Sequence, residues 1–146
     1  MKVRTCIAAI GATALVGTGA FMLPALASAT STTHTLKFIS VQKNMVFFTK
    51  TTFGVQDTDV NAKNKTVGFD ELYFKAISKS KAVANVTLDT TGGLLYGTLT
   101  VNFTSPVING KVTGGTGAFK GAAGTITGMS LNKAGTRTAV TVKYHT

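Results

Sequence analysis

The residues best suited to acid–base chemistry in this sequence are five carboxylic acids: Asp57, Asp59, Asp70, Glu71 and Asp89. Asp57 and Asp59 are two positions apart, so on a β-strand their side chains share one face. If that face looks into an apolar interior, mutual repulsion raises one pKa and creates an acid/base pair. In the alternative interpretation, both side chains flank a polar turn at 61–64 in solvent.

The other acids are placed by their sequence neighbours. Asp70 and Glu71 are adjacent, so in an extended chain they face opposite sides and at most one reaches an interior. Asp89 precedes Thr90-Thr91-Gly92-Gly93, which is typical of a turn. The candidate catalytic residues are therefore Asp57, Asp59 and Glu71, which we expect near an open end of a pocket.

Aromatic residues supply the candidate ligand-binding groups. Tyr73, Tyr96 and Tyr144 each lie among apolar neighbours in an expected strand. We expect Tyr73 and Tyr96 to orient a ligand through their hydroxyl groups and Phe103 to add apolar wall. The alternative is ordinary packing, with each hydroxyl reaching the surface.

Other catalytic chemistries lack the residues they need. The two histidines, His34 and His145, lie near the ends of the expected mature chain, so neither is placed as a general base, and no Ser–His–Asp set is visible. No His, Cys or carboxylate cluster has metal-ligand spacing. The sequence therefore predicts no metal site and no cofactor.

The N-terminus has the pattern of a secretory signal peptide. Lys2 and Arg4 precede an apolar run from Cys6 to about Leu23, and Ala27-Ser28-Ala29 closes it with an A-x-A cleavage pattern. The alternative, a membrane anchor, fits less well because the run is rich in Ala and Gly and is followed by Pro24. We expect residues 1–29 to be removed by cleavage after Ala29 and residues 30–146 to form one secreted domain without cysteine.

The charge of this domain is strongly positive but scattered. Removing Lys2 and Arg4 lowers the formal net charge from +10 to +8, and no block of five basic residues occurs. Solubility and lysine protection of strand edges explain this pattern, and attraction to anionic polymers or cell surfaces is the alternative. Lysine in place of arginine and the lack of basic–aromatic interleaving argue against nucleic acid. No membrane partner is expected after cleavage.

Residues 30–146 are typical of an all-β domain. Val and Thr dominate, and no sustained 3.6-residue period occurs. In 98–103 the apolar Leu99, Val101 and Phe103 alternate with Thr and Asn, and in 136–145 Val140, Val142 and Tyr144 share one face. Eight or nine short strands imply a sandwich or a closed barrel, and a barrel also removes the exposed sheet edges. The expected strands are 34–42, 45–49, 53–60, 66–77, 82–89, 98–103, 106–113, 123–129 and 136–145, with turn signals at 61–64, 91–93, 109–110 and 132–135.

A glycine-rich stretch, VTGGTGAFKGAAGTITG at 112–128, has no Gly-Lys-Ser/Thr and is followed by a β-branched, alternating segment. It therefore fits neither a phosphate-binding loop nor a dinucleotide fingerprint. We interpret it as structural, with glycines that permit positive φ or close backbone approach at a bend and Phe119 as an apolar anchor. The glycines of this motif are Gly114, Gly115, Gly117, Gly121 and Gly124.

The same stretch resembles a known signature. Val112 to Gly124 is similar to V-T-G-G-T-G-x-[FY]-x-G-A-x-G of the allene oxide cyclase and dirigent families, and FGVQDTDVNAKNKTVGFDELYF at 53–74 is similar to their acidic strand end, polar turn and following strand. The resemblance covers nearly all of 30–146. It implies an eight-stranded antiparallel β-barrel with an apolar lumen, assembled as a homotrimer. The chain departs from allene oxide cyclases because 36–41 holds no carboxylate.

Three functions follow from these observations. The first is a cyclase or isomerase-like barrel that holds a small apolar molecule and steers its reaction mainly by orientation. The second is a barrel that binds an apolar ligand outside the cell without catalysis, and the third is a structural or cell-surface protein. Polar groups pointing into the lumen separate the first from the second, whereas a filled barrel favours the third.

Overall fold

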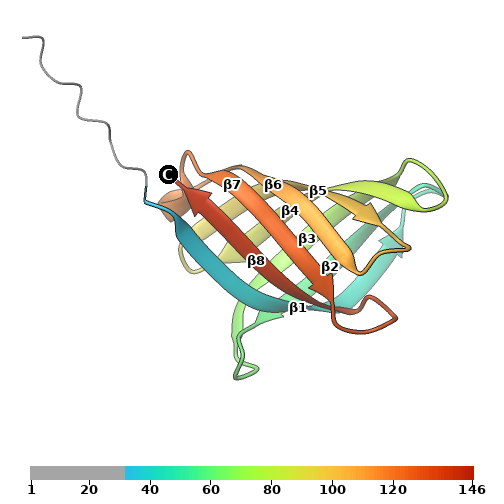
Figure 1. Ribbon diagram of the computed structural model, residues 1–146, viewed down its shortest axis with the longest axis horizontal. Helices are drawn as coiled ribbons and strands as arrows, with labels where there is room; N and C mark the ends of the chain where they lie inside the picture. The colour runs from blue at the N-terminus through green and yellow to red at the C-terminus, as the bar shows by residue number, and fades with distance from the viewer. Residues whose placement is uncertain (1–31) are drawn as a thin grey trace, which may run out of the picture.

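The computed structural model describes residues 32–146, so the predicted signal peptide and its cleavage site lie outside the described residues. Eight strands and one short 3₁₀ helix follow one another (Figure 1). They are β1 (His34–Phe47), β2 (Thr52–Val60), β3 (Thr66–Ala76), β4 (Lys81–Thr90), β5 (Gly93–Asn102), β6 (Val107–Gly115), η1 (Gly117–Phe119), β7 (Ala123–Ser130) and β8 (Arg137–His145).

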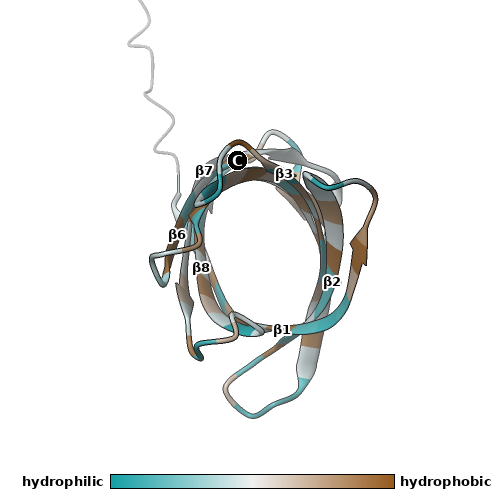
Figure 2. Cartoon of the chain, turned by 90° about the vertical axis from the view of Figure 1, so that its right-hand side faces the viewer, coloured by the Kyte–Doolittle hydropathy of each residue, from teal (hydrophilic) through white to brown (hydrophobic). Residues whose placement is uncertain are grey.

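The strands form a closed antiparallel barrel in chain order, which confirms the predicted fold class. Each strand pairs with its neighbour in the sequence, and β8 pairs with β1 from His34↔Tyr144 to Val41↔Arg137 (Figure 2). Closure leaves no unpaired sheet edge, as expected for a Val- and Thr-rich sheet. Within residues 32–146, no helix has the length and hydropathy to cross a membrane.

Three local predictions are corrected. The segments 34–42 and 45–49 form one strand, because a bulge between Gln42 and Asn44 shifts the register without ending the pairing with β2. The strand predicted at 98–103 begins at Gly93 and ends at Asn102. Asn109-Gly110 lies inside β6, because Gly110 faces Leu99, and a Cβ there would meet the Leu99 side chain and the Thr98 carbonyl.

Alternation along the strands separates a lumen face from an outer face. Leu99 and Val101 of β5 and Val142 and Tyr144 of β8 are buried in the core, and Val140 packs against it, as their alternation predicts. The outer face carries threonine, asparagine and lysine between scattered apolar residues. This pattern is the inside–outside alternation of a small barrel.

The two ends of the barrel differ. One end holds the start of β1, the end of β8 and the connections 61–65, 91–92 and 116–122. Phe119 of η1 is buried there against Tyr144 in an edge-on arrangement, with ring centroids 5.4 Å apart. We call this end the closed end. The opposite end, the open end, holds the connections 48–51, 77–80, 103–106 and 131–136.

Candidate functional site

The lumen contains a cavity of about 530 Å³. Apolar side chains from all eight strands form most of its wall, and the residues of two open-end loops, 103–106 and 132–135, line its mouth. This volume is typical of pockets for small molecules. The filled barrel that would favour a purely structural protein is therefore not what the structure shows.

Carboxyl groups from two neighbouring strands meet in the deep half of this lumen. Asp57 of β2 is the direct cross-strand partner of Asp70 of β3, so their Cβ atoms are neighbours on one face. Ser40 of β1 donates a hydrogen bond of 2.5 Å from Oγ to Asp57 Oδ2. Ser40, Asp57 and Asp70 line the cavity. The acids therefore lie toward the closed end, which corrects the expectation that they lie near an open end.

Asp59 lies behind this group and is completely buried, with 0% of its surface exposed. The residue opposite it on β3 is Gly68, where a Cβ would lie 3.4 Å from Asp59 Oδ2 and 2.5 Å from the Asp89 carbonyl oxygen. The close approach of the Asp89 carbonyl oxygen therefore excludes a side chain at Gly68, and the Asp59 carboxyl group lies at van der Waals distance from this position. Both Asp57 and Asp59 thus face inward, and the alternative of two solvent-exposed turn residues is wrong.

The burial of these acids changes their proton affinity. Burial first, then the charge of Asp70, hydrogen bonding with Asp70 and the charge of Asp57 raise the pKa of Asp59 to about 9. Both Asp59 oxygens and one Asp70 oxygen are buried without a hydrogen-bond donor. Two ionised carboxylates only accept hydrogen bonds, so a proton on Asp59 gives the pair the donor it lacks. At neutral pH the pair therefore holds at least one proton.

The two carboxyl groups that line the cavity are shifted in the same direction. Burial and the charge of Asp57 raise the pKa of Asp70 to about 7, against the lowering effect of hydrogen bonds with Asp59 and Ser40. Burial also raises the pKa of Asp57, opposed by the hydrogen bond from Ser40. Of the described residues that line the cavity, Lys133 alone is basic, and it belongs to a loop at the mouth. Asp57 and Asp70, with Asp59 behind them, form the deep end of the cavity, which we call the carboxyl floor, and no cation that lines the cavity neutralises them there.

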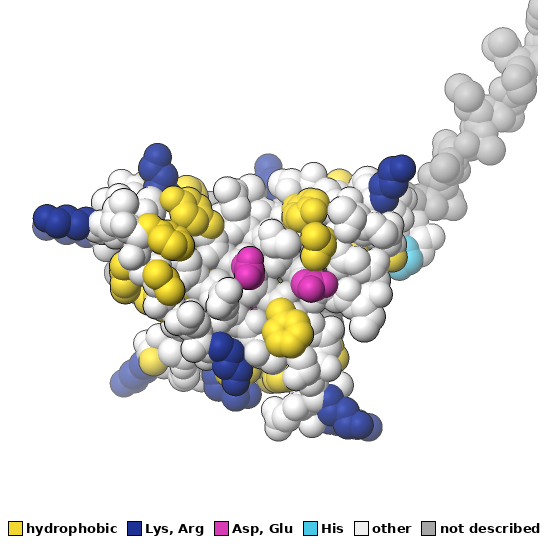
Figure 3. Space-filling view, turned by 180° about the vertical axis from the view of Figure 1, so that it is seen from behind, with side chains coloured by type: hydrophobic (Ala, Val, Ile, Leu, Met, Phe, Trp, Pro, Cys, Tyr) yellow, Lys and Arg dark blue, Asp and Glu magenta, His cyan; other side chains and the backbone are white. Residues whose placement is uncertain are grey.

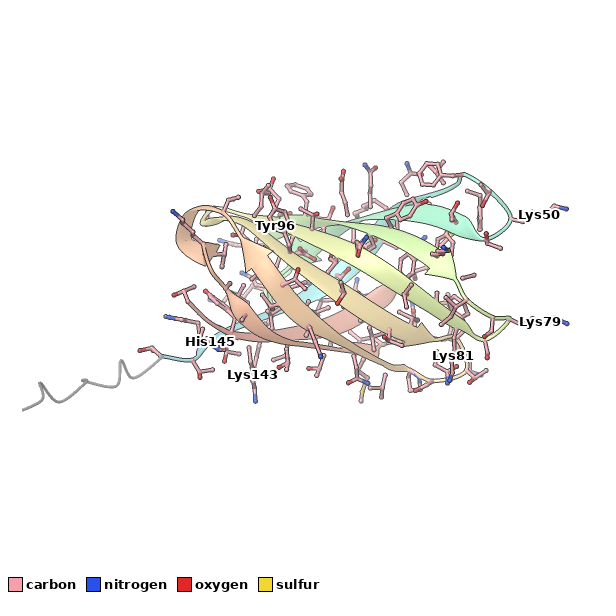
Figure 4. The ribbon with its side chains drawn as sticks, turned by 90° about the horizontal axis from the view of Figure 1, so that it is seen from above. Lys50, Lys79, Lys81, Tyr96, Lys143 and His145 are labelled. Carbon is pink, nitrogen blue, oxygen red and sulfur yellow. The ribbon has the colours of Figure 1, made fainter. Side chains whose placement is uncertain are left out.

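Three of the predicted site residues lie outside the barrel. Glu71 is exposed and accepts a hydrogen bond of 3.1 Å from Gln56 Nε2, so the structure does not bring it to Asp57 and Asp59. Tyr73 is exposed and stacks on Phe48, and Tyr96 is exposed on β5 (Figure 4). Their alternation places them on the outer face, which corrects the expectation that their hydroxyl groups orient a ligand in the lumen.

Phe103 lies where it can contact a ligand, although not within a strand. It follows the last residue of β5, is half exposed and lines the mouth of the cavity. Tyr144, the third tyrosine, is buried near the closed end between His34 and Phe119. It therefore helps to close the barrel.

Sequence reasoning missed Asp70 and Ser40 as members of the site. In 66–76 both faces carry aromatic residues, Phe69 and Tyr73 on one and Phe74 on the other, so alternation alone does not say which face is inward. Ser40 was recoverable, because it shares the face of Leu36 and Phe38 in β1. A serine on an apolar inward face is a signal for a buried hydrogen-bond partner.

The glycine-rich segment forms the bend that carries Phe119 into the closed end. Gly117 has φ +57°, and a Cβ there would collide with the Gly92 carbonyl oxygen. A Cβ on Gly115 would lie 2.5 Å from the Phe119 Cβ and 2.6 Å from the Leu94 carbonyl oxygen. Lack of space excludes a larger residue at both Gly115 and Gly117, and at Gly117 the positive φ adds backbone strain. No group of three or more metal-ligating side chains within 32–146 is arranged to hold an ion.

The fold and the lumen together define a class: eight-stranded barrels around an apolar small-molecule cavity. No protein-family model matches the sequence, and no curated protein matches it either. Solved structures do match. A pterocarpan synthase dirigent protein superposes with a TM-score of 0.64 at 18% identity, over 86% of this chain and 99% of the other. The chain thus has the dirigent-like barrel fold that the sequence resemblance implied.

Two further solved structures have the same fold. A pyocyanin demethylase matches with a TM-score of 0.63 at 15% identity, over 76% of this chain and 99% of the other. An exo-specific intermolecular Diels-Alderase matches with a TM-score of 0.63 at 9% identity, over 79% of this chain and 99% of the other. At these identities the likeness establishes the fold alone.

Proposed function

We propose that this barrel binds a small apolar molecule in its lumen and steers its cyclisation or isomerisation by proton transfer from the carboxyl floor. The observation that carries the proposal is the apolar cavity of about 530 Å³ with Asp57 and Asp70 at its deep end and no cation beside them. The named activities of the similar barrels, a demethylase, a Diels-Alderase and a pterocarpan synthase, add support for small-molecule chemistry.

The floor suits a proton-transfer isomerisation. Asp70 in its protonated form donates a proton to a carbonyl oxygen of the ligand, and ionised Asp57, held by Ser40, accepts a proton from a carbon beside that carbonyl. The resulting enol then takes a proton back at a different carbon and returns the oxygen proton to Asp70. The ligand changes only the position of its double bond, and the protein ends as it began.

Ligand binding is tested by filling the lumen. Val140→Phe adds bulk to the cavity wall, whereas Val83→Phe adds the same bulk to the outer face of β4. We expect wild type and Val83→Phe to bind the neutral probe N-phenyl-1-naphthylamine with a negative ΔCp, and Val140→Phe to bind it at least about tenfold more weakly. Equal binding by all three proteins contradicts a lumen site.

A binding barrel without catalysis is the alternative function. The largely apolar wall supports it, because the polar lining residues outside the acidic cluster lie toward the mouth. They are loop residues and four strand residues of the open half, Gln42, Asn102, Ser130 and Thr138. This alternative keeps the probe binding and predicts that the carboxyl groups are dispensable. Asp70→Asn separates the two, because only a catalytic barrel loses activity with this carboxyl group.

Export and assembly are further proposals. We propose that the chain is secreted, on the basis of the signal-peptide pattern of residues 1–29. A homotrimer is supported by the resemblance and by three aromatic residues exposed on the outer face of β3 and β5: Phe69, Tyr73 and Tyr96. Sedimentation equilibrium of the processed protein measures this state directly.

A further inference from the structure

The four loops of the open end share one feature. Each begins with a large apolar residue that is more than half exposed: Phe48 (59%), Ile77 (59%), Phe103 (52%) and Leu131 (51%). These residues come from connections far apart in the sequence, yet the barrel topology sets them around one opening. Exposed apolar residues gathered around one opening are uncommon on a soluble monomer and indicate a contact surface. We call these four residues the apolar rim.

Basic residues surround the apolar rim. Three of the four loops place a lysine two positions after the apolar residue: Lys50, Lys79 and Lys133. Figure 4 shows Lys50 and Lys79 extending from this end of the barrel. The part of the barrel nearest the open end contains seven basic residues and no Asp or Glu. It comprises the segments 41–56, 72–88, 98–110 and 126–141. Its basic residues are Lys43, Lys50, Lys75, Lys79, Lys81, Lys133 and Arg137.

The closed end has a different surface. Its connections, 61–65, 91–92 and 116–122, contribute no exposed large apolar residue among those described, and the one aromatic residue in them, Phe119, is buried. Figure 3 shows hydrophobic and basic side chains together at the end of the barrel away from the grey N-terminal trace. Among the connections of the described residues, exposed large apolar side chains and lysines therefore occur together only at the open end. At the closed end, the exposed Val67 and Phe69 follow Lys63 and Lys65 but belong to the wall of β3.

We propose that the open end docks on an anionic lipid bilayer, with the apolar rim among the acyl chains and the lysines at the phosphate level. Exposed apolar side chains with a cationic surround are what binding at a membrane interface requires, and long lysine side chains reach the headgroups while their stems stay apolar. The mouth of the cavity then opens toward the acyl region, from which an apolar ligand can enter without crossing water. This docking departs from the sequence-based expectation of no membrane partner, and it does not depend on the chemistry of the carboxyl floor.

Charge favours a lipid surface over a second copy of the chain. Two open ends brought face to face would oppose seven basic residues with another seven, without any acid to offset them. An anionic bilayer supplies the complementary charge, so each lysine near such a surface strengthens binding.

The chain contains no tryptophan, so the fluorescence of a single introduced tryptophan reports the docking. Phe103→Trp places the reporter on the apolar rim, and Ala62→Trp places it in an exposed closed-end loop. Both full-length variants keep the same N-terminal segment, which joins the barrel at the closed end, the end that also holds Ala62. Membrane binding by that segment alone would therefore bring Ala62→Trp to the bilayer and not Phe103→Trp. The probes are vesicles of phosphatidylcholine with about one third phosphatidylglycerol, vesicles of phosphatidylcholine alone, and the same two with brominated acyl chains.

We expect the Phe103→Trp emission to shift to the blue and to be quenched by brominated lipid in the anionic vesicles, while Ala62→Trp is unchanged. Adding Lys50→Gln, Lys79→Gln and Lys133→Gln lowers the vesicle partition coefficient on the order of 100-fold. Equal quenching of both reporters, quenching of neither, or equal binding to both lipid compositions overturns the proposal. A blue shift of Phe103→Trp that grows with protein concentration in the absence of lipid also overturns it, because the apolar rim is then a contact between copies.

Discussion

Burial without a neighbouring cation decides how the lumen aspartates behave. Asp59 has no exposed surface, and Asp57 and Asp70 are cross-strand neighbours that both face the cavity. Removing a carboxyl group from water disfavours its charged form, and a second carboxylate at this distance disfavours it further. The result is that Asp59 and Asp70 hold protons at a pH where ordinary aspartates have lost them.

This proton retention has a consequence for stability. The pKa values of Asp59 and Asp70 are raised to about 9 and about 7, above the value of about 3.9 for an unfolded chain. Between pH 4 and these values the folded state therefore binds more protons than the unfolded state, so stability falls as pH rises through this window. Thermal melts should show the barrel more stable at pH 5 than at pH 9.

Asp59→Asn should remove much of that slope and stabilise the barrel at pH 9, by roughly 1–3 kcal/mol, because an amide carries no charge to bury. Asp89→Asn, at an exposed position of β4, is the matched control and should leave the slope unchanged. A wild-type melting temperature that rises from pH 5 to pH 9 would contradict the raised pKa values.

The proposed catalysis depends on a different subset of these residues. We expect Asp70→Asn to slow the isomerisation of an apolar β,γ-unsaturated ketone to its conjugated form by at least about tenfold, because an amide releases no proton. Glu71→Gln changes the adjacent residue on the outer face and should leave the rate as in wild type. The absorbance of the conjugated product follows the reaction. A wild-type rate no greater than that in buffer would favour binding without catalysis.

At the scale of strands and turns, local sequence rules predicted most elements and failed where tertiary contacts overrode them. The predicted strand at 66–77 differs from β3 by one residue, because a polar turn precedes it and β-branched and aromatic residues fill it. Asn109-Gly110 has the sequence of a hairpin turn but continues β6, since Gly110 is needed where Leu99 fills the lumen. A glycine in a hairpin turn and a glycine opposite a bulky residue within a strand look alike in sequence. Only the residue packed against the glycine in the fold distinguishes them.

The inward faces were predictable only where one face was clearly polar. The faces of Leu99 in β5 and of Val142 in β8 follow from alternation with threonine and lysine. In β3 both faces carry aromatic side chains, so alternation did not identify the inward face. The sequence therefore predicted Glu71 as a site residue, whereas in the structure its neighbour Asp70 faces the lumen. The candidate site was therefore half predicted, with the two β2 aspartates found and the β1 and β3 members missed.

The bend before β7 gives a prediction at the element scale. Gly117→Val and Gly115→Val should each destabilise the barrel by about 1–3 kcal/mol, the first through a β-branched residue at positive φ and the second through a clash with Phe119. Gly121→Asn is the control: Gly121 has φ +77° with nothing within 4 Å of a Cβ, and asparagine tolerates that conformation. Valine variants that melt with wild type would contradict the structural role of these glycines.

At the scale of the whole molecule, the two ends of the barrel differ in their side chains and in their access to the cavity. The closed end is sealed by Phe119 against Tyr144, and the open end combines the mouth of the cavity with the apolar rim. Under the proposed function, a ligand therefore enters through the open end, and the carboxyl floor lies at the far end of its path. Closure of the sheet was predictable from the resemblance and from strand number, but the asymmetry of the ends depends on loop side chains that no periodicity encodes.

Export is the other prediction that concerns the whole chain. We expect the exported protein to begin at Thr30, because the small residues of Ala27-Ser28-Ala29 form the cleavage pattern. N-terminal sequencing of protein recovered outside the cell measures this directly. An intact Met1 in the exported form would contradict the signal-peptide interpretation.

The central claim is that an apolar ligand in the lumen lies against carboxyl groups that hold protons. It is tested most directly by a ¹³C NMR titration of aspartate carboxyl groups, with and without N-phenyl-1-naphthylamine in the lumen. We predict that the pKa values of Asp59 and Asp70 lie well above the ordinary range and that the pKa of Asp57 is raised. The probe should displace water and raise the pKa of Asp57 and Asp70 further. The signal of exposed Asp89 should not move with the probe. Titration of all three lumen aspartates near pH 4, unchanged by the probe, would contradict the account.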